Sequence, residues 1–233
     1  MNTQHFICFR DLPLLYGRVP KVANSSIKAT LYRLLATTPE KGVRTTSDTF
    51  WKSATHGETS MLSNFEARMR RGTHFCFSFV RNPFDRLVSA YNNKIIELEE
   101  IPGPMKEMGL SKSSSFMEFL ECIENTPDDK LDIHLVPQST ILCHENVIIP
   151  NFIGRLETMS EDWSKLQQMM QREGLPQLGE LPQKNVRRGD DHNDIGKYFK
   201  DPALAGLATR RYQDDFELFY GTMRPEELIH PQT

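Results

Sequence analysis

The sequence is poor in cysteine, and the four cysteines it has lie far apart along the chain: Cys8, Cys76, Cys122 and Cys143. It contains no C-x-x-C pair and no cluster of cysteine with histidine, so the ligand spacing of a zinc site is missing. We therefore expect reduced, buried thiols and no bound metal.

A long apolar segment is also missing. No run of about 18 apolar residues occurs, although a membrane-spanning helix needs that length. The first ten residues, MNTQHFICFR, lack the apolar core of a signal peptide. We expect a soluble, cytoplasmic protein without an integral membrane segment.

Positive charge is not in excess, since the formal net charge is -3. A general nucleic-acid binder neutralises many phosphates with a basic surface, so this class is not expected and any anion site has to be local. With 233 residues, 38% hydrophobic and 25% charged, the chain suits a single domain spanning 1–233.

The phosphate-binding motif G-x-x-x-x-G-K-[ST] is absent, although residues 16–35, YGRVPKVANSSIKATLYRLL, have the order of strand, polar turn and helix in which it occurs. Lys21 opens the turn instead of closing it, and no glycine follows before Gly42. Ser25 or Ser26 is expected to cap the helix. The helix is indicated by the spacing of its apolar residues: Ile27, Leu31, Leu34 and Leu35.

A second strand and helix repeat this plan. The apolar run THFCFSFV (73–80) predicts a buried strand, and Pro83 stands near the start of the helix FDRLVSAYNNKIIELEE that follows. Two such units predict an α/β fold with a central parallel sheet flanked by helices.

The remaining patterns predict a surface loop at 101–115, a short helix at 116–124, a strand at 146–157 bent at Pro150, and a polar loop at 181–194. Thr158 and Glu161 are expected to form a capping box for a helix that stops at Gly174. The last helix is expected to open at Asp201 and to bury most of its aromatic residues.

Polar residues follow both strands where an open α/β sheet binds ligands, beyond the carboxyl ends. After the first strand, Lys21 and residues 24–26 can surround a tetrahedral anion, or they form an ordinary capped helix with a solvated lysine. After the second, Arg81 suits a phosphate or a structural ion pair, and Ser89 can add a hydroxyl. Two such sockets indicate a ligand with two separated anionic groups.

These segments resemble the membrane-type carbohydrate sulfotransferases, the family of the chondroitin and dermatan 4-O-sulfotransferases and the HNK-1 sulfotransferase. RVPKVANSSIK resembles the loop that binds the 5'-phosphosulfate, and FSFVRNPFDRLVSAYNNK resembles the motif that binds the 3'-phosphate. Further similar segments follow in the family's order: HLVPQSTILC (134–143), NFIGRLETMSED and RRYQDDFELFYG. Many members have Cys-Thr-Asn-Trp where this chain has residues 24–27.

The resemblance implies a P-loop-like three-layer fold, and it implies 3'-phosphoadenosine 5'-phosphosulfate as the sulfuryl donor without a required metal. It implies that the donor is bound by Lys21, Val22, Ala23, Asn24, Ser25, Ser26, Ile27, Arg81 and Ser89. The segment Arg187, Arg188 and Gly189 resembles a run that soluble sulfotransferases place over the 3'-phosphate, so Arg188 joins the set. Lys21 would neutralise the bridging oxygen during transfer, and Lys28 is a second contact or a surface lysine.

The acceptor is expected to be a hydroxyl group of a carbohydrate, and a general base is expected to take its proton. His56, between the two donor motifs, is the first candidate, and His134 is the second. Glu157 is a third only if it faces the cleft. Two other functions stay open at this point: a nucleotide phosphotransferase of the kinase type, and a nucleotide- or glycan-binding protein without turnover.

Overall fold

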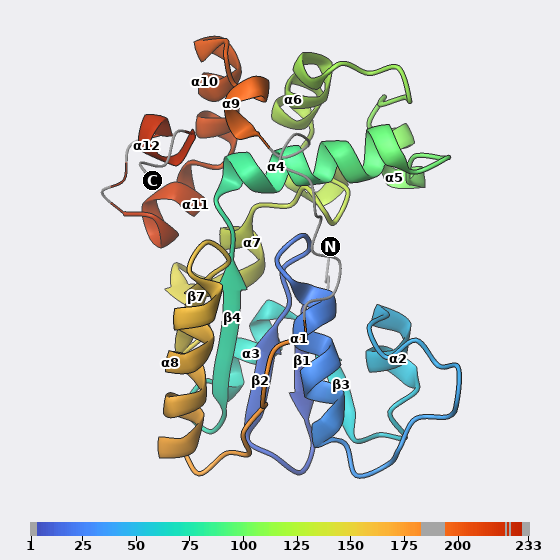
Figure 1. Ribbon diagram of the computed structural model, residues 1–233, viewed down its shortest axis with the longest axis vertical. Helices are drawn as coiled ribbons and strands as arrows, with labels where there is room; N and C mark the ends of the chain where they lie inside the picture. The colour runs from blue at the N-terminus through green and yellow to red at the C-terminus, as the bar shows by residue number, and fades with distance from the viewer. Residues whose placement is uncertain (1–3, 183–193, 222, 224, 230–233) are drawn as a thin grey trace. The chain divides into compact units, whose positions relative to one another are not determined.

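The structure is a computed structural model that describes residues 4–182, 194–221, 223 and 225–229 (Figure 1). The chain forms two compact units, one of Met1–Val80 with Thr140–Arg187 and one of Arg81–Ser139 with Arg188–Thr233. The single domain 1–233 stays a prediction, as does the cytoplasmic location. In the described ranges, every helix is too short or too polar to cross a bilayer.

The first unit is built on a five-stranded sheet with the order β3-β1-β2-β4-β7. The strands are β1 (Phe6–Phe9), β2 (Leu14–Gly17), β3 (Thr59–Leu62), β4 (Phe75–Val80) and β7 (Phe152–Arg155). Strands β2, β4 and β7 are parallel, and β1 is antiparallel to both of its neighbours. The predicted α/β class with a central, mostly parallel sheet is confirmed, with two strands, β1 and β3, that the sequence did not predict. Of these two, only β1 runs opposite to the other strands.

Helices cover both faces of this sheet. Figure 1 shows α1 and α8 on the near face and α3 behind. The elements beside the sheet are α1 (Asn24–Leu31), η1 (Tyr32–Leu34), α2 (Asp48–Ser53), α3 (Asn64–Arg70), α8 (Met159–Arg172) and the hairpin β5 (Cys143–His144) with β6 (Val147–Ile148). A short helix, α7 (Gln138–Leu142), lies where the chain passes from one unit to the other.

A close contact inside the sheet explains one residue of the segment NFIGRLETMSED. Gly154 of β7 pairs with Phe79 of β4, and a Cβ atom at residue 154 would lie 2.2 Å from the Phe79 ring. The Phe79 ring in turn packs against Trp163 of α8 at 5.9 Å between centroids. Glycine is therefore needed here for close packing of strand and helix.

The predicted strand 146–157 is interrupted at Pro150, as expected, and forms β6 and β7. The capping box predicted for α8 is wrong, because the Thr158 side chain does not cap the helix. Its hydroxyl donates instead to Asp162 at 2.7 Å, and Asp162 also accepts the N–H of Arg155 at 2.9 Å. The helix ends before Gly174, whose φ of 71° is the left-handed conformation expected of a glycine stop.

The second unit is helical. Its elements are α4 (Pro83–Tyr91), the π-helix η2 (Asn92–Glu97), α5 (Gly103–Glu107), α6 (Phe116–Asn125), η3 (Asp128–Lys130), α9 (Ile195–Tyr198), α10 (Pro202–Arg211), α11 (Gln213–Phe219) and α12 (Pro225–Ile229). Asn82 caps α4 by accepting the N–H of Phe84 at 3.0 Å. The Phe84 ring packs between Phe199 and Phe216, at 4.9 and 5.0 Å.

Four predictions for this unit can be compared with the structure. The helix at 116–124 is confirmed as α6, and the aromatic residues of the last helix are mostly buried, as expected. The predicted loop 101–115 contains the short helix α5. The last helix is capped by Asp201 as predicted, but it breaks at Tyr212 into α10 and α11.

Candidate functional site

The loop between β2 and α1 has an unusual backbone. Lys21 and Ala23 have φ values of 69° and 41°, a left-handed conformation that residues other than glycine rarely adopt. Such residues cost about 1–3 kcal/mol each and persist where the surroundings impose them, which is typical of ligand-binding loops. The predicted serine cap is wrong, because α1 starts at Asn24 and its N-cap is Ala23, with no side-chain cap. The N-cap residue Ala23 therefore offers the first N–H groups of α1 no side-chain acceptor.

The side chains of this loop divide into anchors and polar groups. Val22 and Ile27 are almost fully buried, so only the main chain of Val22 can contact a ligand. The predicted donor contact of Ile27 is wrong, because its N–H donates to the carbonyl of Ala23 at 3.0 Å and its own carbonyl accepts the Thr30 hydroxyl at 2.8 Å. Asn24 and Ser25 are half-buried, and Asn24 is oriented by the Tyr16 hydroxyl, which donates to its Oδ1 at 3.1 Å. This hydrogen bond fixes which end of the Asn24 amide is the oxygen, and the amino group at the other end is the donor that can bind an anion.

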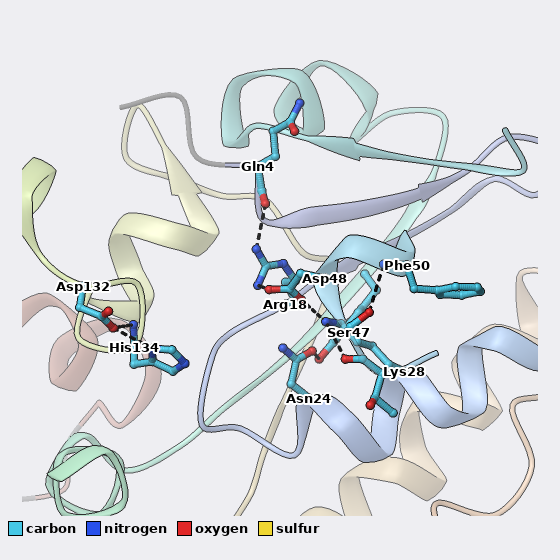
Figure 2. A network of polar contacts seen from close by, with 11 residues as sticks. Gln4, Arg18, Asn24, Lys28, Ser47, Asp48, Phe50, Asp132 and His134 are labelled. Atoms are coloured by element: carbon cyan, nitrogen blue, oxygen red, sulfur yellow. Dashed lines mark hydrogen bonds and ion pairs between the residues drawn. The ribbon is translucent and has the colours of Figure 1, made fainter. Parts of the chain in front are cut away.

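An ionic cluster with two buried cations holds both ends of this loop. Arg18, just after β2, donates to Asp48 Oδ2 at 2.7 Å, and Lys28 of α1 contacts Asp48 Oδ1. Figure 2 shows both cations pointing at this carboxylate, while Arg18 also donates to the carbonyl of Gln4 at 3.2 Å. Lys28 is therefore neither a surface lysine nor an open contact for the donor, because its side chain is only 2% exposed. The sequence missed this cluster because Asp48 follows a polar loop without periodicity.

Burial dominates the electrostatics of the cluster. It lowers the pKa of Arg18 and of Lys28, and the charge of Asp48 opposes that shift in both. Two cations and one carboxylate leave the cluster with a surplus of positive charge. This surplus lies at the loop that bears the unusual backbone, and it favours an anion there.

The arginine motif begins directly after the last residue of β4. The Nε of Arg81 donates to Asp85 Oδ2 at 2.7 Å, so the structural ion pair that the sequence left open is present. Ser89 lies one turn further along α4 and is buried. The side chain of Arg81 is thus fixed on the face of α4 that carries Ser89.

Of the candidate bases, His134 has a partner that orients it. Its Nδ1 lies 2.7 Å from Oδ1 of Asp132, which also accepts the His134 N–H at 2.9 Å (Figure 2). A carboxylate only accepts, so this contact requires a proton on Nδ1, and in the neutral ring the lone pair is then on Nε2. Burial raises the pKa of Asp132, but the hydrogen bonds and charge of His134 outweigh it and hold the pKa below its usual range. The sequence offered only the two-residue spacing Asp-x-His as a signal for this pair.

His56 lies in an exposed turn, with a φ of 50°. His56 precedes Thr59, the first residue of β3, which pairs with Phe9 at one end of β1. The loop with Lys21 follows Gly17, the last residue of β2, which pairs with Phe6 at the other end of β1. These two edges of the sheet are about 10 Å apart along β1. The register therefore separates His56 from the loop.

The remaining predicted residues add little. Glu157 is exposed between β7 and α8. Arg188 lies outside the described residues, as does Arg187. Within the ranges that the structure describes, no group of three or more His, Cys, Asp or Glu side chains forms a metal site. Of the cysteines, Cys8 and Cys76 are buried and Cys122 and Cys143 are half-buried, all with free thiols.

The sequence of this chain is similar to those of known sulfotransferases. The model of the sulfotransferase family matches residues 4–221. Carbohydrate sulfotransferase 14 of Danio rerio is 29% identical over 200 residues, which cover 78% of this chain and 52% of the relative. Carbohydrate sulfotransferase 10 of Pongo abelii is 24% identical over 261 aligned positions, covering 97% and 68%. Carbohydrate sulfotransferase 9 of Homo sapiens is 26% identical over 213 positions, covering 81% and 46%.

The chain spans about half the length of the first of these relatives. No solved structure is significantly similar to it. The family match takes in both strand ends, the loop after β2 and the arginine motif after β4. The chain belongs to the sulfotransferase family.

Proposed function

We propose that this protein transfers a sulfuryl group from 3'-phosphoadenosine 5'-phosphosulfate to a hydroxyl group of a carbohydrate. The observation that carries the proposal is the loop after β2, where left-handed Lys21 and Ala23 precede a helix without a side-chain cap. Membership of the sulfotransferase family supports the reaction, and the names of the similar carbohydrate sulfotransferases support the acceptor class.

Each unit offers residues that suit one anionic group of the donor. In the proposal, the N–H groups of residues 22–25 and the side chains of Asn24, Ser25 and Ser26 bind the 5'-phosphosulfate, because an uncapped helix N-terminus favours an anion. The N–H groups of Ser26 and Ile27 are not included, because both donate to the carbonyl oxygen of Ala23, at 2.9 and 3.0 Å. Arg81 and Ser89 bind the 3'-phosphate, and Arg188 stays a predicted contact to it. The buried surplus charge of Arg18 and Lys28 favours the same anion from behind the loop.

When bound, the donor supplies a sulfuryl group whose transfer leaves negative charge on the bridging oxygen. The ammonium of Lys21 would neutralise that charge, which is stabilisation aimed at the transition state. We propose that no metal ion is needed, because a sulfuryl group carries less charge than a γ-phosphoryl group.

For the base we propose His134 in preference to His56. Its Nδ1 is held by Asp132 at 2.7 Å, so Nε2 is the nitrogen that would take the proton of the acceptor hydroxyl. The register of the sheet separates His56 from the loop that carries Lys21. His134→Ala is expected to lower kcat by about 10²- to 10⁴-fold, the usual contribution of a general base, with unchanged binding of 3'-phosphoadenosine 5'-phosphate. Full activity in that variant, with loss in His56→Ala, would move the role to His56.

Thermal unfolding tests the choice of nucleotide. We expect 3'-phosphoadenosine 5'-phosphate to raise the Tm in the presence of EDTA, and ATP with magnesium to raise it much less at the same concentration. Stabilisation that requires magnesium, or an equal effect of the two nucleotides, would favour the phosphotransferase alternative instead. Binding without transfer to any carbohydrate would favour a nucleotide-binding protein.

A further inference from the structure

The side chain of Gln138 forms two hydrogen bonds with the main chain of Arg81. Its Oε1 accepts the N–H of Arg81 at 2.9 Å, and its Nε2 donates to the carbonyl oxygen of Arg81 at 2.8 Å. Gln138 is fully buried, and its two bonds resemble those of a neighbouring strand. Only a carboxamide side chain offers a donor and an acceptor side by side, and Asn is one methylene shorter. Glutamine is therefore specified at this position by the contact with Arg81.

Gln138 is itself held from the opposite side by Asp215 of α11. The carboxylate of Asp215 accepts the main-chain N–H of Gln138 at 2.9 Å and that of Ser139 at 2.7 Å. Asp215 is fully buried, and Arg86 of α4 is a nearby buried cation. Burial raises the pKa of Asp215, whereas Arg86 and the two N–H groups act in the opposite direction. A chain of buried polar contacts thus runs from α11 through Gln138 to Arg81.

Arg81 is consequently fixed at two places. Its main chain is held by Gln138, and its Nε is held by Asp85 at 2.7 Å. An arginine whose main chain and Nε are both held keeps its guanidinium in one orientation, which is what selective phosphate recognition requires. Arg81 directly follows β4 and precedes α4, and Gln138 supplies main-chain hydrogen bonds at this junction.

We propose that Gln138, backed by Asp215, is a positioning residue that makes Arg81 selective for nucleotides with a 3'-phosphate. The inference rests on the proposed function, in which Arg81 binds that phosphate. Gln138 touches neither substrate, and its effect reaches the ligand through the Arg81 backbone.

The test compares two nucleotides that differ only in the 3'-phosphate. Affinities of 3'-phosphoadenosine 5'-phosphate and of adenosine 5'-phosphate are measured by calorimetry for the full chain and for Gln138→Met, which removes both hydrogen bonds at similar volume. We expect the affinity for the 3'-phosphorylated nucleotide to fall about tenfold, and that for adenosine 5'-phosphate to stay unchanged. Gln213→Leu, an exposed glutamine of the same unit, is the matched control and should change neither.

Equal loss of both affinities in Gln138→Met would mean a general structural role and would overturn the proposal. If Gln138→Met does not fold, Gln138→Asn is used instead. Its amide is one methylene shorter and does not reach the main chain of Arg81, so affinity for the 3'-phosphorylated nucleotide alone should fall in the same way.

Arg81→Ala separates this proposal from the proposed function. If Arg81→Ala leaves the ratio of the two affinities unchanged, Arg81 does not bind the 3'-phosphate and the proposed site is wrong. If Arg81→Ala abolishes the preference but Gln138→Met retains it, only the positioning role fails. If Gln138 acts through Arg81, adding Gln138→Met to Arg81→Ala should cause no further loss of preference.

Discussion

Replacing Asp48 with alanine removes the carboxylate that contacts both Arg18 and Lys28. The two cations stay buried, with side chains 8% and 2% exposed, and they then repel each other without this carboxylate between them. Removal of one partner of a buried ion pair costs about 3–5 kcal/mol. The Asp48 side chain is 52% exposed, however, so solvent screens part of its interaction.

Between the buried and the exposed limits, we expect Asp48→Ala to lower the free energy of unfolding by about 2–3 kcal/mol. In a chain of this length, that loss lowers the Tm by roughly 4–12 °C. Calorimetry gives the Tm, and urea unfolding followed by circular dichroism gives the free energy.

The matched control is Asp11→Ala, because Asp11 pairs at 3.0 Å with Arg10 and both side chains are exposed. It should leave the Tm unchanged. Adding Lys28→Met to Asp48→Ala removes one of the two buried cations that have lost their carboxylate, and it should restore part of the lost free energy of unfolding. Equal Tm values for Asp48→Ala and Asp11→Ala, or a purely additive effect of Lys28→Met, would refute the role given to this cluster.

Three further predictions concern the loop, the sheet and the histidine pair. Lys21→Gly and Lys21→Ala should both lower kcat by about 10²- to 10³-fold in a transfer assay with little change in nucleotide affinity, and the glycine variant should be the more stable because φ is 69°. Gly154→Ala should cost about 1–3 kcal/mol in urea unfolding, because its Cβ would lie 2.2 Å from the Phe79 ring. Asp132→Asn should destabilise the protein more at neutral pH than in acid: the pKa of Asp132 is lowered from 3.8, so its stabilising contact with His134 is present above 3.8 and is lost as the pH falls through the lowered pKa.

Each of these has its own contrary result. A Lys21→Gly variant with full kcat would remove the lysine from the transfer step. Gly206→Ala, in helix α10 with only the side-chain end of Arg210 at 3.4 Å, is the control for Gly154→Ala and should be neutral or stabilising. An effect of Asp132→Asn that does not depend on pH would mean that the charge of Asp132 contributes nothing to its contact with His134.

Local signals predicted the parts of the fold that depend on local chemistry. The apolar run 73–80, the polar turn after β2 and the cap at Asp201 each correspond to an element in the structure. Strands β1 and β3 were not predicted, because each has only four residues and their antiparallel pairing joins segments about fifty residues apart. Their stability comes from partners in the sheet, which a local pattern does not contain.

The candidate site divides in the same way. The residues proposed to bind the donor, Lys21, Arg81 and Ser89, follow predicted strands, so their position in the sequence could identify them. The residues that support the site have no such signal. Asp48 lies 20 residues from its partner Lys28, and Gln138 lies 57 residues from its partner Arg81. Sequence analysis placed His56 first among the candidate bases because it lies between the two donor motifs along the chain. The edge of the sheet at which a residue lies depends instead on the register of β1 and β3, which the order along the chain does not contain.

The most direct test of the proposed function is the transfer reaction itself. The full chain is incubated in EDTA with 3'-phosphoadenosine 5'-phosphosulfate labelled in the sulfuryl group and with a panel of carbohydrates, and Lys21→Ala serves as the inactive comparison. We predict that label passes to a carbohydrate hydroxyl without a divalent metal, and that this transfer is lost in Lys21→Ala. Absence of label in every carbohydrate, together with magnesium-dependent transfer from γ-labelled ATP, would contradict the account.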